Sequence, residues 1–320
     1  MSPAPRPRPL RPLRPLAVTA LLALALPGPA LAQAAGTTLA PAAPVPAPGS
    51  VSDRPPVTSQ AGQAPAAAED PVERLGGLLA LPEIIALMQD EGAGYAEDVE
   101  GELFPGKGGG GWIDEVRALY APERTSPIFF RAFRDSLGAR DLEPMARFFT
   151  DGVGARAVPL EVSARRAMLD PDVEDDATLK AGDMMAARDP RFRSLSAFIE
   201  AGDMVEANVI GGLNANLAFW RGLSEGGAFP EPMAEEDLLA KAAGQEEALR
   251  AESRDWLFAY LALAYAPLSE RELADYTAFS ASGPGRALNT AIFAGFDAVF
   301  VDVSHRMGVA AAHRIAGQTL

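Results

Sequence analysis

Few residue patterns in this chain point to a chemical reaction. The sequence contains no cysteine, which excludes disulfides, thiol catalysis, thiolate metal sites and iron–sulfur clusters. Its two histidines, His305 and His313, lack the i, i+4 spacing that places two metal ligands on one helix face. The remaining candidate is Ser282 in the segment SGPGR, which could hold a reactive serine, an anion site or only a joint between two helices.

The residues that precede Ser282 have the pattern of an ordinary helix start. Ser269 and Glu272 form the S-x-x-E capping box, in which each side chain satisfies a backbone N–H group of the first turn. The helix that follows would turn one face inward, and that face would carry Leu273, Tyr276 and either Phe279 or Ser280.

The residues from Ser282 onward have the pattern of a joint between two helices. Gly283 suits the left-handed conformation that ends a helix. Ser282 would accept N–H bonds from the next helix, which has Pro284 in its first turn. Gly285 would let two helices approach each other closely.

An internal repeat supports the joint. The segment LGARDLEPMARFFTDGVGARA and the segment LSERELADYTAFSASGPGRAL align without gaps at a shift of 268 − 137 = 131. Upstream, LPEIIALM resembles LSAFIEAGDM at a shift of 195 − 81 = 114. The pairs at the joint are Leu142 with Leu273, Phe148 with Phe279, Asp151 with Ser282, Gly152 with Gly283, and Gly154 with Gly285.

The alignment argues against chemistry at Ser282. Asp151 stands in its place in the first copy, and serine and aspartate are interchangeable as helix N-caps but not as nucleophiles. Arg286 beside a helix N-terminus could bind an anion, but the first copy has Ala155 there. We therefore predict a structural helix–turn–helix joint.

Two other segments lack the pattern of a phosphate or metal site, and a group of aromatic residues has the spacing of core residues. In FPGKGGGGW, residues 104–112, the lysine precedes the glycines and no strand comes before it, so a loop before a helix is expected. The acidic residues of 169–181 lack the glycine and glutamate of a calcium loop and fit a helix start. The aromatic residues at helical spacing favour core over a ligand pocket: Trp112, Trp220, Trp256, Phe129, Phe130 and Phe133.

The elements that must position these residues are helices. The apolar spacing over 81–103 is mostly helical, and residues 284–316 form a long amphipathic helix. Its apolar stripe contains Leu288, Ile292, Phe293, Phe296, Val299, Phe300, Val303 and Met307, with Asn289, Asp297 and Asp302 off the stripe. No convincing strand pattern occurs, so we predict an all-α helical bundle built from two related modules, residues 71–186 and 187–317.

The N-terminal region has the pattern of an export signal. Residues 1–32 contain four arginines, an apolar run at 16–26 and a small-x-small cleavage site at Ala30–Ala32. The apolar run is shorter than the roughly 20 residues that span a membrane. Residues 33–70 are rich in alanine and proline and are expected to be a disordered linker.

Charge and signal together predict the location. After cleavage near Ala32, 28 − 4 = 24 basic residues would face 43 acidic ones, a net charge of −19. Phosphate backbones and anionic membranes repel such a chain, so nucleic-acid partners are not expected. We predict a periplasmic protein with no transmembrane span after signal cleavage.

The segment LSERELADYTAFSASGPGRALN resembles the hallmark of an uncharacterised family of exported bacterial proteins, domain of unknown function 2059. Glu272-Leu273, Phe279, Ser282 and Gly285 match the family pattern. Ser280 stands where the family often has tyrosine, and the proline is displaced by one position. The first copy matches less well. The resemblance implies an α-helical periplasmic protein and implies no known activity.

The sequence leaves three hypotheses about function. The first is a non-enzymatic protein that binds an envelope protein through a groove between the modules. The second is a carrier of a small apolar or lipid-like ligand in a closed pocket of about 300 Å³ or more. The third is a hydrolase that uses His305 or a pair of carboxylates. No cofactor, metal site or catalytic residue is predicted.

Overall fold

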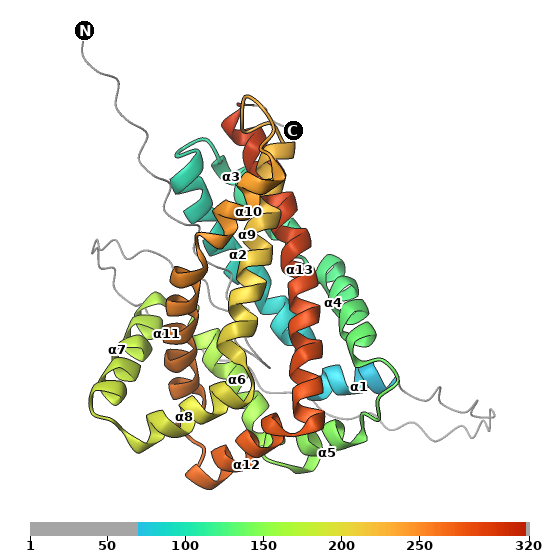
Figure 1. Cartoon of the computed structure of the whole chain (residues 1–320), viewed down its shortest axis with the longest axis vertical. Coiled ribbons are helices and arrows are strands. Elements are labelled where there is room, and N and C mark those ends of the chain that lie inside the picture. The colour runs from blue at the N-terminus through green and yellow to red at the C-terminus, as the bar shows by residue number, and fades with distance from the viewer. Residues whose placement is uncertain (1–69, 318–320) are drawn as a thin grey trace, which may run out of the picture.

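The computed structural model describes residues 70–317, and the predicted signal peptide and nearly all of the predicted linker lie outside these residues. The described part is helical throughout and contains no strand, which confirms the predicted all-α fold (Figure 1). The helices are α1 (Pro71–Leu78), α2 (Leu81–Leu103), α3 (Gly109–Leu119), α4 (Pro122–Leu137), α5 (Glu143–Asp151), α6 (Gly154–Ala167), α7 (Pro171–Ala186), α8 (Pro190–Ala201), α9 (Met204–Glu225), α10 (Glu235–Ala243), α11 (Glu246–Ala264), α12 (Glu270–Ala281) and α13 (Gly283–Ile315).

Aspartate–proline pairs set several helix starts. Proline suits the first helical position because its missing N–H would be unpaired there in any case. The preceding aspartate then caps the first turn with its side-chain oxygen. This arrangement begins α1, α7 and α8, where the caps are Asp70, Asp170 and Asp189. At α7 it explains why the acidic stretch over 169–181 is a helix start.

The last helix, α13, is the axis of the body. It packs along α9 on one side and along α4 on the other (Figure 1). Within the described residues it is long and apolar enough to cross a membrane, but more than half of its apolar window is buried in the protein, as expected of a core helix. The prediction of one amphipathic stripe is therefore too simple, because buried residues lie around much of the helix.

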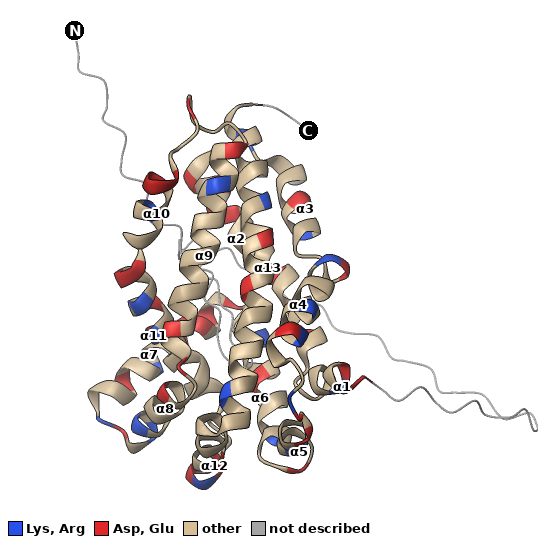
Figure 2. Ribbon diagram, turned by 45° about the vertical axis from the view of Figure 1, so that its right-hand side comes forward, with Lys and Arg blue, Asp and Glu red and all other residues tan. Residues whose placement is uncertain are grey.

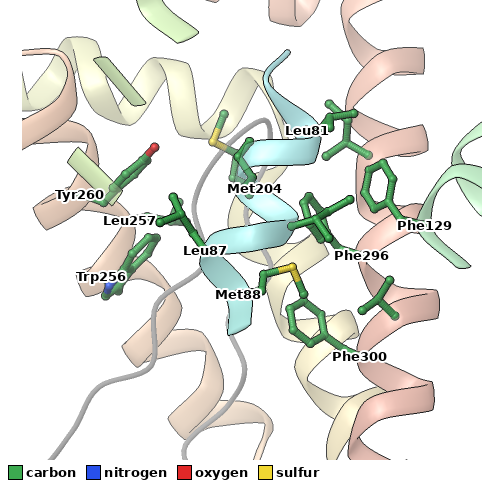
Figure 3. Close-up of a cluster of buried hydrophobic side chains, with 14 of the residues drawn as sticks. Leu81, Leu87, Met88, Phe129, Met204, Trp256, Leu257, Tyr260, Phe296 and Phe300 are labelled. Atoms are coloured by element: carbon green, nitrogen blue, oxygen red, sulfur yellow. The ribbon is translucent and has the colours of Figure 1, made fainter. Parts of the chain in front are cut away.

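One hydrophobic core joins the two predicted modules. Side chains of α2 lie between those of α11 on one side and those of α4 and α13 on the other (Figure 3). Ion pairs between helices add contacts at the surface, such as Arg124 with Asp302 at 2.6 Å and Arg314 with Glu115 at 2.9 Å. Charges of both signs are spread over the outer helix faces (Figure 2).

The helix order recurs along the chain. Helices α1 to α6 correspond in order to α8 to α13, and α7 connects the two sets. The contacts recur as well: α1 touches α5 as α8 touches α12, and α4 touches α13 as α11 touches α6. In the contacts between α4 and α13 and between α11 and α6, a helix of one set packs against a helix of the other set. This helix order is the one that the predicted repeat would produce. The duplication itself stays a prediction.

The upstream register of the predicted repeat is wrong. Leu195, which we aligned with Leu81, lies inside the short helix α8. The structural counterpart of Leu81 is Met204, because each begins a long helix directly after a residue in the left-handed conformation, Ala80 or Asp203. The shift here is therefore 204 − 81 = 123. Local sequence similarity missed the turn that fixes the correspondence.

Candidate functional site

The structure places Ser282 in a joint, as predicted. Ser282 ends α12 and caps α13, and its Oγ atom accepts a hydrogen bond from the N–H of Gly285 at 3.1 Å. The same hydroxyl donates to the carbonyl oxygen of Phe279 at 2.6 Å. Both hydrogen-bonding roles of the hydroxyl therefore serve the backbone of the joint.

The capping box before the joint is also present. The N–H of Ser269 donates to the Glu272 carboxylate at 2.8 Å, and the N–H of Glu272 donates to Ser269 Oγ at 3.3 Å. The Ser269 hydroxyl donates to the same carboxylate at 2.7 Å, and this bond, together with the Ser269 N–H and Arg156, lowers the pKa of Glu272 to about 2. A charged Glu272 thus holds the start of α12 and ties it to α6.

The glycines of the joint differ in their roles. A Cβ atom at Gly285 would lie 1.9 Å from the carbonyl oxygen of Phe279, so only glycine allows this approach of α13 to α12. The left-handed conformation expected for Gly283 is wrong, since Gly283 is the first residue of α13 and has no positive φ. Ser282, with extended backbone, makes the turn without it.

The first-copy joint is built differently from the second. Asp151 does not cap a helix as predicted, because it is the last residue of α5, and Val153 precedes α6 without a side-chain cap. Gly152 and Val153 separate the two helices here, whereas Ser282 alone separates α12 from α13. Gly154 keeps its expected role, since a Cβ atom there would lie 2.5 Å from the Phe149 ring.

The two joints meet through aligned residues. Phe148 and Phe279 stack face to face with ring centroids 3.8 Å apart and an interplanar angle of 4°. Leu273 is fully buried, whereas its partner in the alignment, Leu142, precedes α5 and packs at the edge of the core. All the residues predicted at the joints are thus placed as structure and not as a reactive centre.

The other candidates from the sequence do not converge. His305 lies 2.8 Å from Glu225 at the half-exposed surface of α13. No group of three or more acidic or histidine residues in the described chain could hold a metal ion. The three tryptophans, Phe129 and Phe133 are core residues, as expected. The loop predicted over residues 104–112 is shorter than expected, because the glycines at 109–111 belong to the first turn of α3.

Sequence reasoning did not find the hollow that lies between α9 and α13. The two helices run in parallel, since Gly202 lies near Asn289, Asn214 near Asp297 and Gly222 near His305. At one end they are in close contact: a Cβ atom at Gly222 would lie 2.0 Å from the carbonyl oxygen of His305. At the other end, near the N-terminal ends of both helices, a hollow of about 390 Å³ opens between them.

The hollow has apolar walls and polar groups at its base and rim. Ile210 of α9 is 52% exposed although it is a large apolar residue, and Phe293 of α13 is only partly buried. Phe293, predicted to belong to the core stripe, packs against the core and also lines this hollow. The lining comprises Ala201, Gly202, Asp203, Ala207, Ile210, Gly211, Asn214, Arg286, Asn289, Thr290, Phe293, Ala294 and Asp297.

Asn289 is the unusual residue of the hollow. It was predicted off the apolar stripe of α13, but it is only 4% exposed. Neither Oδ1 nor Nδ2 of its side chain has a hydrogen-bond partner within the protein. An unpaired buried polar group costs about 1–3 kcal/mol. Both atoms are covered by the surrounding protein, so Asn289 lies beside the hollow with its amide atoms buried.

The charged residues that line the hollow are mostly acidic. Burial raises the pKa of Asp297, and a hydrogen bond from Asn214 at 2.9 Å partly offsets that rise. Asp203 is exposed at the turn before α9, with φ of 52°, and its side chain does not cap the helix. Arg286 donates to the carbonyl oxygen of Ala281 in its own joint. The hollow thus has two acidic residues and one basic residue.

A second buried polar group joins α6 to α11 and α12. Glu161 is 1% exposed, and its Oε1 accepts a hydrogen bond from the Tyr265 hydroxyl at 2.6 Å. Tyr260 donates to the Glu161 backbone oxygen at 3.0 Å. Burial raises the pKa of Glu161 to about 7, against the opposing effect of the Tyr265 and Tyr276 hydroxyls. This carboxyl lies inside the core, away from the residues that line the hollow.

No protein-family model, curated protein or solved structure matches this chain. The resemblance to domain of unknown function 2059 therefore stays a prediction that rests on the residues of the joint.

Proposed function

We propose that this chain is an exported, non-enzymatic helical protein that binds a segment of a partner protein in the hollow between α9 and α13. The observation that carries the proposal is the hollow itself, in which an exposed Ile210 and a partly buried Phe293 offer apolar surface beside polar groups. Export rests on the signal-like residues 1–32, and membership of the exported family rests on the sequence of the joint.

The hollow offers a mainly apolar surface with several polar groups, which fits a peptide segment that has both apolar and polar parts. A site for a lipid-like molecule would be lined almost wholly by apolar groups. Here Asn214, Asn289, Asp203 and Asp297 line the same space as Ile210. The hollow is also shaped by helices of the second set alone, so the groove between modules that the sequence suggested is replaced by a groove within one set.

Site-specific photo-crosslinking tests the proposal. A photoreactive residue at position 210 should capture a peptide of a partner protein in cells that make the chain, and mass spectrometry should identify that peptide. Position 179 is the matched control, since Leu179 on α7 is 69% exposed and lies outside the hollow. The substitution Ala207→Trp, which fills the hollow, should abolish capture at 210, whereas Ala248→Trp on exposed α11 surface should not.

The result that would overturn the proposal is equal capture at positions 210 and 179, or capture at 210 that survives Ala207→Trp. The second candidate, a carrier of a small ligand, is favoured by one observation, the volume of about 390 Å³, which lies in the range of small-molecule sites. Native mass spectrometry of the purified protein distinguishes it, because a carrier would retain a small molecule of defined mass.

A further inference from the structure

We infer that the partner of the hollow is a second copy of this chain, which lays its own α9 and α13 antiparallel on those of the first copy. This inference rests on the proposed function, because it names the protein whose segment enters the same hollow. The two-fold axis of the dimer crosses both helices at the level of Asn214 and Asp297, so each copy contributes the same residues to the interface.

The outward side of α9 and α13 is apolar beyond the hollow as well as within it. On α9, Ile210 is 52% exposed, and Leu217, seven residues later, is partly exposed. On α13, Ala294 and Val301 repeat this spacing, and Val301 is 36% exposed. Seven residues are about two helical turns, so each pair lies on one side of its helix. Figure 1 shows the two helices side by side along the body, and we call their shared outward side the α9–α13 face.

The exposed apolar residues of the α9–α13 face are placed symmetrically. Asn214 and Asp297 are at the same level, since their side chains are hydrogen-bonded at 2.9 Å. Ile210 lies four residues before Asn214, and Val301 lies four residues after Asp297, which is about 6 Å along each helix. An antiparallel second copy therefore brings its Val301 to the level of Ile210, where the hollow opens.

Packing favours the antiparallel orientation. In a parallel dimer the two hollows, each of about 390 Å³, would lie on each other and leave a void, which protein interiors rarely contain. In the antiparallel dimer, the hollow of each copy lies opposite Val301 of the other copy. The end where Gly222 closely approaches α13 then lies over the open end. The apolar side chain and the hollow are each used twice, as a two-fold interface requires.

The charges of the face also suit a second copy. The chain carries a net charge of −15, which opposes self-association over most of its surface. Each end of the α9–α13 face instead carries both signs: Asp203 and Arg286 line the hollow, and Glu225 pairs with His305 at the other end. Antiparallel contact therefore sets no group of like charges against another at the ends. Near the axis the two Asp297 carboxylates approach each other, which weakens the dimer when both are charged.

The face is large enough for a dimer. Helix α9 has 22 residues and is therefore about 33 Å long. Two helices packed 8–10 Å apart present a face about 20 Å wide. Each copy would thus bury roughly 700 Å², close to the roughly 800 Å² for each partner in a standard protein interface.

Sedimentation velocity of the purified protein over a range of concentrations tests the dimer. The unaltered protein should form dimers, and Val301→Asp should weaken them at least tenfold, because it places a charge in the opposite hollow. Leu179→Asp, at the exposed position on α7, is the matched control and should leave the dimer unchanged. Asp297→Asn should tighten the dimer, because it removes the like charges at the axis. Circular dichroism confirms that each variant keeps its helices.

Cross-linking tests the orientation. The chain has no cysteine, so introduced thiols are the only ones present. Residues 294 and 301 lie at nearly equal distances on either side of residue 297, so the antiparallel axis brings position 294 of one copy to position 301 of the other. A short bismaleimide should therefore join Ala294→Cys protein to Val301→Cys protein more efficiently than it joins either variant to itself. Equal yields in the three cases would show that the antiparallel dimer is wrong.

The inference and the proposed function fail on different results. A protein that stays monomeric at all concentrations, or a dimer that Val301→Asp leaves intact, overturns the second copy as partner. Photo-crosslinking at position 210 then decides the proposed function: capture of a different protein keeps it, and no specific capture ends it. If the inference holds, the peptide captured at position 210 comes from this chain and contains Val301.

Discussion

The buried carboxyl of Glu161 gives a stability prediction whose sign and size follow from the structure. Its pKa is raised by burial from about 4.5 to about 7. A raised pKa stabilises the folded state fully below the unfolded pKa, and that contribution is lost as pH rises through the folded pKa. Across the window from pH 4.5 to pH 7, the loss amounts to about 3 kcal/mol at about 1.4 kcal/mol for each pKa unit.

The perturbation is Glu161→Gln, which keeps an oxygen for the Tyr265 hydroxyl but cannot ionise. The free energy of unfolding of this variant, relative to the unaltered protein, should rise by about 3 kcal/mol between pH 4.5 and pH 7.5 and then stay level. The amide in the Glu161→Gln variant also brings an NH₂ group that needs a hydrogen-bond partner, and this lowers stability equally at every pH. The prediction therefore concerns only how the stability difference changes with pH.

Urea unfolding followed by circular dichroism at several pH values measures the difference. Glu247→Gln is the matched control, because Glu247 is exposed near the start of α11, the helix that carries Tyr260. A difference between Glu161→Gln and the unaltered protein that stays constant within about 0.5 kcal/mol from pH 4.5 to 7.5 would refute the reasoning. That result would mean that water or relaxation solvates the Glu161 carboxylate.

Three further predictions concern the packing of the hollow and the joints, each measured by urea or thermal unfolding. Gly308→Ala should cost more than about 2 kcal/mol, since its Cβ atom would lie 2.2 Å from the Phe219 carbonyl oxygen. Gly77→Ala, with nothing within 4 Å, should instead be neutral or stabilising by up to about 1 kcal/mol, and an equal loss at both glycines would contradict the close approach. Ser269→Ala should cost about 1 kcal/mol through loss of the capping box, and no loss would show that the cap is not needed. Asn289→Leu should raise stability by about 1–3 kcal/mol, and a decrease would mean that the amide has a structural partner after all.

The joint between α12 and α13 could be predicted because its determinants are local, whereas the cap predicted at Asp151 is wrong. Ser269 and Glu272 satisfy each other within one turn, and Ser282 bonds groups within three residues of itself. Capping patterns of this kind depend on spacing along the chain and little on the rest of the fold. The left-handed conformation predicted for Gly283 is wrong because the same residue pattern fits two turns. In one turn a left-handed glycine ends the helix, and in the other Ser282 both ends α12 and caps α13. The structure has the second turn.

The hollow could not be predicted because it depends on how far apart two helices lie. Gly222 and Gly308 fix the close contact at one end of the pair, and nothing in their local sequence says which helix each one meets. Asn289 did carry a signal, since an amide beside Leu288 and Ile292 on a core helix is costly unless it has a partner. That signal could have singled it out, but only the structure shows that the partner is missing.

The two sets of helices differ at the position that Asn214 occupies in the second set. Asn214 of α9 corresponds to residue 214 − 123 = 91 of α2. Glu91 there accepts two hydrogen bonds of 2.6 Å from Arg165 of α6, and this buried ion pair joins α2 to α6.

In the second set, the shorter Asn214 reaches only Asp297 of the facing helix, and the space beyond it stays open. Removing a long buried side chain leaves a cavity that the backbone closes only in part. The ion pair of Glu91 and Arg165 thus fills a position that the shorter Asn214 leaves open in the second set, although α9 and α13 pack closely further along, at Gly222 and Gly308.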